Sequence, residues 1–557
     1  MFQPLTYPFK IETTLINKSS LSLDGSMKVS IHWVIDQKNR KVHFSVETKP
    51  VRNLIWLAVG FSDHGDYEKS DLCVFENDQL TDSHVDKEGV IEDDDQQDCV
   101  LESSRTLPDG RMTIFYNRKF KTGDPDDMDI EFGTTLFVVA AGESRRKNLF
   151  GDFVRKTVTP NRILQSDEPP PKMDRNTKII DITVKNISIP PVETTYWCTV
   201  QRLPRMFRQK HHIVKFEAVV TPENVGIVHH MEVYHCDPDQ TEKLIRVPKF
   251  DGPCTPDTLP EQAKFCRKVI GAWAMGAKAF DYPNIAGIPF GGPNYFPFVM
   301  IEIHYNNFQF RRGRVDNSGI RFYFTDKLRK YDAGILETGL EYTNRMAIPP
   351  GQTMFPLSGY CMSECTDRLH SHLTGREIET IVAHEGRGWE YLNTDRHYSP
   401  HWQEIRLIKP VTVYPGDSLI TTCRYVTTKK NNVTFGGLSI SDEMCVNYMH
   451  YYPYVDLEAC KSAVDPDDLS RFFDFFAIKN NSTTSQKYSS IDWNEADNVA
   501  KLHLLYKNGR HKPECRRKNG ELYQMNYYVF KNNCSILDYQ NLTEKMITKT
   551  TRKVNDT

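Results

Sequence analysis

The strand-like character of this chain is clearest in Gly226-Ile227-Val228-His229-His230-Met231-Glu232-Val233-Tyr234 and in Phe298-Val299-Met300-Ile301-Glu302-Ile303-His304-Tyr305. Both are short runs rich in apolar residues, which is typical of β-strands. The same texture extends from about residue 193 to 510, and Tyr414-Pro415-Gly416-Asp417 has the composition of a turn between strands. This part of the chain is therefore expected to be built of β-sheets.

A second β-rich region precedes it, from residue 26 to 145. Residues 27–34 alternate apolar with polar side chains, as a half-buried strand does, whereas residues 54–60 are continuously apolar, as in a strand covered on both faces. Short strands separated by turns predict a β-sandwich. Ser166-Asp167-Glu168-Pro169-Pro170-Pro171 then reads as a linker, and the last fifty residues, polar and rich in Lys and Asn, as a partly ordered tail.

Length and charge limit the classes of function. The chain has 557 residues, more than one hydrophobic core usually supports, so about three domains are expected. Its net charge of -3 provides no strong field of one sign, and this argues against a nucleic-acid or membrane-surface partner. The densest basic stretch, Arg311-Arg312-Gly313-Arg314, is short and reads as a solvated loop.

The cysteines indicate an oxidising compartment. There are thirteen of them, without a Cys-x-x-Cys pair that would favour a zinc ribbon or a thioredoxin-like site. Glycosylation sequons accompany them, and the two features together favour the secretory pathway: the ER lumen, a secretory vesicle or the extracellular space. The N-terminus shows no signal peptide, and no apolar run is long enough for a transmembrane helix. The sequons begin at Asn17, Asn186, Asn432, Asn480, Asn481, Asn533, Asn541 and Asn555.

Histidines and one methionine form a candidate metal constellation. His229 and His230 are neighbours, so they can converge on one ion only at a strand end or a bulge. His304 lies in another predicted strand, and His-x-His spacing places both rings of residues 370 and 372 on one face of a strand. Met444 adds a thioether. Imidazoles with one soft thioether favour copper, which cycles between soft Cu(I) and nitrogen-preferring Cu(II).

Any one of these residues alone would more often be a core or surface residue than a ligand. His211 and His212, a second adjacent pair that follows Arg208-Gln209-Lys210, are assigned to a polar surface. Four further histidines are interpreted as structural, and these are His235, His397, His401 and His450.

Longer stretches around the constellation resemble the copper type II, ascorbate-dependent monooxygenases. They are 229–233, Gly271-Ala272-Trp273-Ala274-Met275-Gly276-Ala277-Lys278-Ala279-Phe280, His372-Leu373-Thr374-Gly375-Arg376, His397-Tyr398-Ser399-Pro400-His401 and Glu443-Met444-Cys445-Val446-Asn447-Tyr448. The similarity runs from about residue 195 to 520 and is closest to the branch that resembles dopamine β-hydroxylase. Residues 20–150 resemble the DOMON β-sandwich, through Gly60-Phe61-Ser62-Asp63 and Ser70-Asp71-Leu72.

The resemblance implies an all-β chain with two jelly-roll-like copper domains after the DOMON sandwich. The expected parts are a DOMON domain at 1–160, a Pro-rich linker at 161–192, an electron-transfer copper domain at 193–333, an O2-binding copper domain at 334–515 and a tail at 516–557. His229, His230 and His304 would hold the electron-donating copper, and His370, His372 and Met444 the copper that binds O2. Two copper ions per chain and ascorbate are the implied cofactors. The implied reaction hydroxylates a C–H bond of a small, phenethylamine-like substrate and needs no catalytic acid or base from the protein.

The same resemblance implies five disulfides, and it also exposes a departure. The implied pairs are Cys198–Cys254, Cys236–Cys266, Cys361–Cys460, Cys365–Cys515 and Cys423–Cys445, with Cys73, Cys99 and Cys534 left over. The family has about a dozen more residues between the paired cysteines and the His-x-His, whereas here Cys365-Thr366-Asp367-Arg368 runs directly into Leu369-His370. Loss of a strand changes the register of a sheet, so the second copper site is expected to be the weaker one.

Two other functions remain open, as does homo-oligomerisation. The chain could hydroxylate glycine-extended peptides, because Arg368 stands where the amidating enzyme of the family binds a carboxylate and Tyr448 is compatible with that role. It could also be a secreted binding protein with a damaged site. A DOMON region without a lyase domain favours the hydroxylase.

Overall fold

The fold is given by a computed structural model, which forms two compact units. One consists of residues 1–169 with 395–398, and the other of residues 170–394 with 399–557. The structure describes residues 17–523 except 24–26, 49–53, 109–110, 145–146, 165–172, 238–248, 256–257, 363–369, 372–373, 385–386, 401, 404–409, 440, 479–480 and 519.

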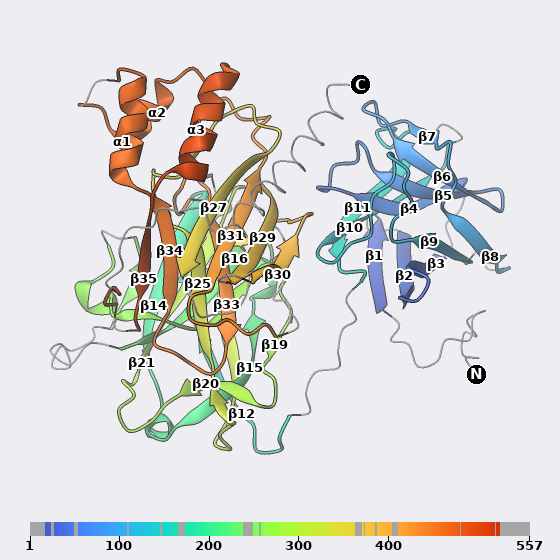
Figure 1. The fold of residues 1–557 in the computed structure, drawn as a ribbon. Helices are drawn as coiled ribbons and strands as arrows, with labels where there is room; N and C mark the ends of the chain where they lie inside the picture. Colours follow the sequence, from blue (N-terminus) through green and yellow to red (C-terminus); the bar gives the residue numbers. More distant parts are fainter. Residues whose placement is uncertain are drawn as a thin grey trace. The chain divides into compact units, whose positions relative to one another are not determined.

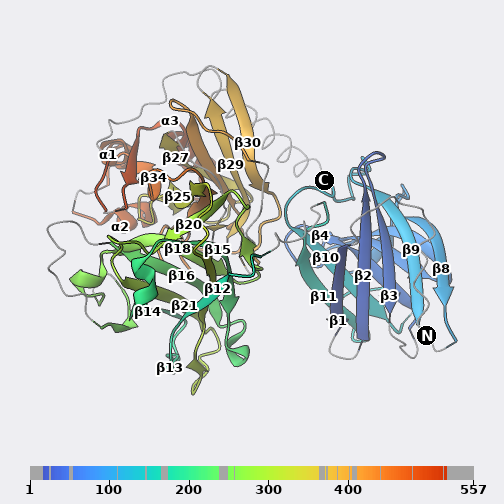
Figure 2. The ribbon, with the colours of Figure 1, turned by 90° about the horizontal axis from the view of Figure 1, so that it is seen from below.

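The first unit is a sandwich of two antiparallel sheets, drawn in blue to teal in Figures 1 and 2. Its core lies between them: Phe44 of one sheet packs against Phe61 and Phe137 of the other. One sheet is β1 (Asn17–Leu23), β2 (Met27–Asp36), β3 (Lys41–Thr48), β9 (Met112–Lys119) and β8 (Val100–Thr106). The other is β11 (Val154–Asn161), β10 (Thr135–Gly142), β4 (Trp56–Ser62), β5 (Asp71–Glu76), β6 (Gln79–Val85) and β7 (Ile91–Asp93).

Strand β4 is buried at every position, as its continuously apolar sequence predicts. Leu57 and Val59 join the core between the sheets, and Trp56 and Ala58 join a second apolar cluster on the outer face. Strand β2 instead alternates buried with half-buried or exposed residues over most of its length, in agreement with its alternating sequence.

The first half of the second unit, residues 178–333, also consists of two facing sheets around one core. One contains β12 (Lys178–Thr183), β23 (Gly319–Thr325), β15 (His211–Val219), β20 (Ala286–Phe290), β24 (Tyr331–Asp332) and β19 (Phe280–Asp281). The other is β17 (Asp251–Pro253), β14 (Thr194–Arg202), β21 (Phe298–Asn306), β16 (Val228–Cys236) and β18 (Cys266–Ala274), while β13 (Ile187–Ser188) pairs with β22 (Val315–Asp316). Short 3-10 helices span Arg205–Arg208, Pro222–Asn224 and Glu261–Ala263.

Strand alternation in β16 and β21 decides which side chains form the core. Met231 and Val233 of β16 and Ile301 and Ile303 of β21 belong to the core cluster. Because neighbours on a strand point to opposite faces, the residues between them lie on the other face of this sheet. That face carries both histidines and glutamates.

The second half, residues 334–523, repeats the sandwich plan. One sheet is β28 (His370–Ser371), β33 (Cys445–Tyr451), β25 (Gly334–Leu340), β34 (Ala459–Val464) and β35 (His511–Arg516); the other is β27 (Phe355–Met362), β31 (Ser418–Tyr425), β29 (Gly375–His384) and β30 (Gly388–Asp395), and β26 (Ala347–Ile348) pairs with β32 (Thr434–Phe435). Ile335 of β25 joins the core of the first half, so the two sandwiches form one compact unit.

Three helices follow β34, in a region that the sequence analysis treated as strand-like. They are α1 (Pro466–Phe475), α2 (Thr484–Ser489) and α3 (Ala496–Asn508), drawn in orange to red in Figure 1. Local capping explains them: the Asp465 side chain accepts hydrogen bonds from the N–H groups of Asp467 and Asp468, and Pro466 occupies the first turn. The all-β class still holds, because strands dominate both units. In the part of the chain that the structure describes, no helix has the length and apolarity needed to span a membrane.

Candidate metal centre

The adjacent histidines sit at a β-bulge in β16, the feature that their convergence requires. Val228 pairs with Tyr305 and His230 pairs with His304 of β21, so His229 is an extra residue without a cross-strand partner of its own. The bulge allows two successive side chains to turn toward the same face of the sheet. His229 and His304 are almost fully buried, and His230 is half-buried.

The three imidazoles of residues 229, 230 and 304 converge through their Nδ1 atoms. His229 Nδ1 lies 3.1 Å from His230 Nδ1, and His304 Nδ1 lies 3.4 Å from the same atom. Ligands that share one ion at about 2.0 Å are about 2.8–3.5 Å apart, so the spacing suits a single metal. A donor set of three imidazoles without a carboxylate fits copper better than calcium or magnesium.

Neighbouring groups hold these rings in place. Tyr196 of β14 stacks on His304, with ring centroids 4.4 Å apart and planes 8° from parallel. The Tyr196 hydroxyl donates to the carbonyl oxygen of Leu438 in the second half of the unit, at 2.8 Å. Met275 N–H donates to the His229 carbonyl at 2.8 Å and fixes the bulged backbone. These contacts fix the orientation of the three rings.

Two described parts of the second predicted set, the backbone of His370 and Met444, lie on or beside β33. His370 and Ser371 form β28 and pair with Val446 and Cys445, so the backbone of the His-x-His segment reaches the strand that begins just after Met444. Met444 is buried, and its carbonyl accepts a hydrogen bond from the Tyr425 hydroxyl at 2.9 Å. His372 and the side chain of His370 lie outside the described residues, as does the shortened segment before them.

One carboxylate ties the two arms of this second set together. Glu443, which directly precedes Met444, accepts hydrogen bonds from the N–H and the hydroxyl of Thr374, both at 2.6 Å. Thr374 follows His372 by two residues. Cys445, on the other side of Met444, is bonded to Cys423 of β31. Met444 is thus held from both neighbours.

Three glutamates, of which Glu232 is buried and Glu302 and Glu337 are half-buried, lie where the two sandwiches of the second unit meet. Glu232 and Glu302 are directly paired across β16 and β21, and each is two residues from a histidine of the first cluster, on the same face of the sheet. Glu337 of β25 comes from the other sandwich and forms an ion pair with Lys461 at 3.0 Å. Tyr448 donates to Glu337 at 3.4 Å, and Tyr234 donates to Glu232.

These carboxylates differ in their electrostatics. Burial and, to a smaller extent, the nearby Glu232 together raise the pKa of Glu302 to about 8, and burial raises the pKa of Glu232 to about 6. Burial also opposes ionisation of Glu337, but Lys461 and the Tyr342 hydroxyl outweigh it, and the pKa of Glu337 lies below its usual value. The sequence analysis did not single out these residues, although two of them could have been found by the two-residue period of a strand.

The cysteine pairs are placed as follows. Bonds join Cys198 to Cys254, Cys236 to Cys266 and Cys423 to Cys445. Cys460 lies within bonding distance of both Cys361 and Cys515, and since a sulfur forms one disulfide, only one of these two bonds can exist at a time. Cys365, the predicted partner of Cys515, lies outside the described residues.

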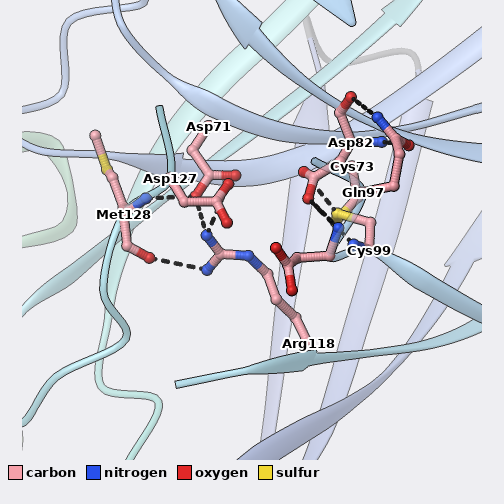
Figure 3. The surroundings of a disulfide bond; sticks show 9 residues. Asp71, Cys73, Asp82, Gln97, Cys99, Arg118, Asp127 and Met128 are labelled. Atoms are coloured by element: carbon pink, nitrogen blue, oxygen red, sulfur yellow. Dashed lines mark hydrogen bonds and ion pairs between the residues drawn. A yellow bond between two sulfur atoms is a disulfide. The ribbon is translucent and has the colours of Figure 1, made fainter. Parts of the chain in front are cut away.

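A further disulfide, between Cys73 and Cys99, lies in the first unit beside buried charges (Figure 3). Asp82 accepts hydrogen bonds from the N–H groups of Asp98 and Cys99. Arg118 forms ion pairs with Asp71 and Asp127, and all three side chains are almost completely buried. Burial raises the pKa of Asp82 to about 7, and the charge of Asp127 adds to this effect. Cys73 and Cys99 were left over in the sequence analysis and are partners here.

The assignment of His211 and His212 to a polar surface is wrong. Both are buried in β15, where His211 packs edge-on to Phe207 and His212 Nε2 lies 2.7 Å from Asp332 Oδ1. The polar residues before this pair suggested a surface position, but β15 is an interior strand of its sheet with a neighbour on each side.

The remaining predicted positions fall in three groups. His235 is buried and His450 half-buried, and they are hydrogen-bonded to the Phe296 carbonyl and the Tyr282 hydroxyl respectively, which are structural roles. Three sequon asparagines are exposed: Asn186, Asn432 and Asn481. The side chain of Asn17 and all of His401, Asn480, Asn533, Cys534, Asn541 and Asn555 lie outside the described residues, as does Arg368.

Comparisons with known proteins agree with this geometry. Family models match at residues 25–142 (DOMON domain), 180–312 (copper type II ascorbate-dependent monooxygenase, N-terminal domain) and 331–473 (C-terminal domain of the same family). Human dopamine beta-hydroxylase is 41% identical over 85% of this chain and 80% of its own length. Tyramine beta-hydroxylase of Caenorhabditis briggsae is 35% identical over 89% and 87%, and human DBH-like monooxygenase protein 1 is 31% identical over 80% and 74%.

These matches span both sandwiches of the second unit and include the bulged histidines and Met444. The family uses two copper ions, with ascorbate as the reductant, and the first histidine cluster fits a copper ion in donor type and spacing. The chain is a member of the copper type II, ascorbate-dependent monooxygenase family, with an N-terminal DOMON domain.

Proposed function

We propose that this chain hydroxylates a carbon atom of a small aromatic amine of the phenethylamine type. In this proposal His229, His230 and His304 hold the electron-donating copper, and His370, His372 and Met444 hold the copper that binds O2. The copper ions, when bound, supply the electrons and activate O2. Because the second ligand arm follows the shortened segment, we propose two copper affinities, with the site of Met444 the weaker.

The proposed substrate class rests on the three glutamates between the two sandwiches. Glu232, Glu302 and Glu337 bring three carboxyl groups together where the two sandwiches meet, and within the described part of the chain Lys461 is the one cationic side chain that forms an ion pair with them. Arg516 lies farther away and pairs with Glu514. Glu302, with a pKa near 8, is mostly protonated at neutral pH in the absence of a ligand. A bound ammonium group would favour the ionised forms of Glu302 and Glu232, so the cluster favours a cationic ligand.

The relatives support the same class of substrate. Two of the similar proteins are named dopamine beta-hydroxylase and tyramine beta-hydroxylase, and the substrate in each name is an aromatic amine. In this chain the protein's part would be to bind the ammonium group near the glutamates and to orient the side-chain carbon. The tyrosines around them, Tyr234, Tyr342 and Tyr448, would hold the carboxylates in position through the hydroxyl groups that they direct at Glu232 and Glu337.

The test compares an amine with a neutral analogue. The substrates are tyramine and the same molecule with a hydroxyl in place of the amine, assayed by ascorbate-dependent O2 consumption and product analysis. In Glu337→Gln the KM for the amine should rise about 10- to 100-fold, the range expected for loss of a hydrogen bond to a charged group. The KM for the neutral analogue should change little.

Controls separate binding from damage to the metal site. Glu217→Gln removes a carboxylate from the opposite sheet, where it accepts a hydrogen bond from Tyr323, and should leave both substrates unaffected. Copper content of all variants is measured in parallel. Equal loss for amine and neutral analogue in Glu337→Gln would contradict the proposal.

Peptidylglycine-type hydroxylation is the competing function, and the same glutamates disfavour it. A glycine-extended peptide ends in a carboxylate, which the ionised carboxylates of Glu337 and Glu232 would repel. Turnover of glycine-extended peptides in preference to amines would reverse this choice. Absence of turnover with every substrate, together with fewer than two copper ions per chain, would instead indicate a binding protein with a damaged site.

A further inference from the structure

Three adjoining loops at one end of the first sandwich of the second unit expose large apolar side chains. Five such side chains are among the most exposed of the described residues: Val192 (48%), Val225 (70%), Phe308 (46%), Phe310 (59%) and Val315 (49%). Figure 2 shows strand β13, which begins this region, at the outer end of the sandwich. A soluble protein commonly scatters such residues singly, so a group of five on neighbouring loops indicates a contact surface.

Hydrogen bonds show that the loops belong together. Asn307 N–H donates to the Glu193 carbonyl at 2.8 Å, which joins the loop of Phe308 to that of Val192. The Asn224 side chain donates to the Val315 carbonyl at 2.9 Å, which joins the loop of Val225 to β22. The five exposed apolar residues therefore lie on segments that hydrogen bonds join at one end of the sandwich, and these residues are here named the loop surface.

The loop that carries both phenylalanines is held in a fixed shape. The buried side chain of Asn307 accepts a hydrogen bond from Arg311 N–H at 2.9 Å and donates to the carbonyls of Pro190 and Arg311 at 3.2 and 3.0 Å. Phe310 has φ of +50°, a conformation that favours glycine and is costly for a bulky residue. The fold thus maintains an exposed aromatic side chain at a strained position, which solubility alone does not explain.

Cationic groups alternate with these apolar ones. Arg311, Arg312 and Arg314 follow Phe310 within four residues. Among the described residues none of the three forms an ion pair with a carboxylate; Arg314 donates to the Glu223 backbone carbonyl at 3.0 Å, and Arg311 to the side-chain oxygen of Gln309 at 2.7 Å. Glu193 and Glu223 are the two exposed acidic residues on the same loops, so arginines are in excess.

We propose that the loop surface docks on an anionic membrane surface. Phenylalanines and valines on loop tips can enter the boundary between headgroups and acyl chains, while the arginines contact acidic headgroups. Whole-chain charge does not predict this, because the net charge of -3 is spread over 557 residues, whereas the docking would depend on charges within one loop.

Docking at this end would also set the position of the first histidine cluster. Val225 precedes His229 by four residues, and Phe308 follows His304 by four. Four residues of extended strand span roughly 13 Å, so the cluster would lie within a short distance of the membrane surface. This consequence does not depend on the substrate proposed above.

The experiment is co-sedimentation of the full chain with phosphatidylcholine vesicles, with and without phosphatidylserine. The wild-type chain should bind the phosphatidylserine vesicles, and added salt should weaken the binding. Phe308→Ser with Phe310→Ser, and separately Arg311→Glu with Arg312→Glu, should each lower the affinity at least tenfold.

Matched controls use side chains of the same kind elsewhere. Phe153→Ser removes a phenylalanine that is 71% exposed in the first unit, and Arg205→Glu with Arg208→Glu reverses two exposed charges in the same sandwich. Both should bind vesicles as the wild type does. Copper content at the histidine cluster and circular dichroism verify folding of each variant.

Three outcomes would overturn the proposal. The first is equal binding to vesicles with and without phosphatidylserine. The second is loss of binding in the control variants to the same extent as in the loop variants. The third is a wild-type chain that binds no vesicles but self-associates through the loop surface, shown by a change in oligomeric state only in the loop variants.

Discussion

Thr374→Val should weaken the second copper site while leaving the first intact. Thr374 supplies two hydrogen bonds to the carboxylate of Glu443, one from its N–H and one from its hydroxyl, each 2.6 Å long. Valine has nearly the shape of threonine but lacks the hydroxyl donor. The substitution therefore removes one of the two bonds and creates almost no cavity.

The size of the effect follows from the burial of this pair. Glu443 is 1% exposed and Thr374 is 6% exposed, so water cannot readily replace the lost donor. Loss of a hydrogen bond to a charged group costs about 1.5–3 kcal/mol. Because Glu443 precedes Met444 and Thr374 follows His372, this bond fixes the distance between two proposed ligands. Groups that support ligands in this way typically contribute about 10- to 100-fold to metal affinity.

Copper titration of the purified chain is the appropriate assay, with Cu(I) and a competing chelator of known affinity. The site of Met444 should lose about 10- to 100-fold in affinity, and the site of His229, His230 and His304 should be unchanged. Turnover should fall in parallel. A second prediction within the same experiment is that high copper concentration restores part of the turnover.

Ser462→Ala is the matched control. Ser462 is fully buried in β34, where its hydroxyl accepts a hydrogen bond from Tyr360 N–H at 2.9 Å, but it is remote in sequence from the proposed ligands. Its loss should lower stability without altering copper affinity. Equal copper affinities in wild type and Thr374→Val, or equal losses in Thr374→Val and Ser462→Ala, would refute the positioning role of Glu443.

Three further predictions concern other parts of the chain. Met444→Ala should abolish oxygenation but retain copper at the histidine cluster, because only the thioether that favours Cu(I) is lost; wild-type turnover in this variant would contradict the ligand assignment. Mass mapping without reduction should find Cys423 bonded to Cys445, and free thiols at both would disprove the link beside Met444. The free energy of unfolding of the first unit, measured with a chelator present, should fall by about 1.4 kcal/mol per pH unit as the pH rises from about 4 to 7. The reason is that folded Asp82, with a pKa of about 7, keeps a proton that the unfolded chain has released. Asp82→Asn should flatten this slope.

The sequence alone could predict the features that depend on neighbours along the chain. Adjacent His229 and His230 required a strand end or a bulge, and β16 has a bulge, because its pairing with β21 skips a residue at His229. Continuous apolarity in residues 54–60 predicted a strand covered on both faces, and β4 (Trp56–Ser62) is buried throughout. Both inferences use only the period of a strand, so no knowledge of the tertiary fold was needed.

Features that depend on distant segments could not be predicted in this way. Glu337 approaches Glu232 only because β25 of one sandwich packs near β16 of the other, and nothing in the local sequence of either strand indicates it. His212 was assigned to the surface from its polar neighbours, whereas its burial results from the pairing of β15 with β20 and β23. Cys73 and Cys99 similarly become partners through the packing of the DOMON sandwich.

Helix α1 shows a different limit, because its signal was present in the sequence but was outweighed. Asp465 followed by Pro466 is a helix start that depends on side-chain capping, and it stands directly after the apolar strand β34. A long β-rich stretch encouraged the continuation of the strand pattern past this cap. The net charge likewise did not reveal the loop surface, because a value of -3 for the whole chain does not show that three arginines follow Phe308 and Phe310 closely in sequence. Residues at helix caps and loop tips should therefore be assessed separately from the surrounding sequence, because they can specify a helix or a contact surface within a long β-rich region.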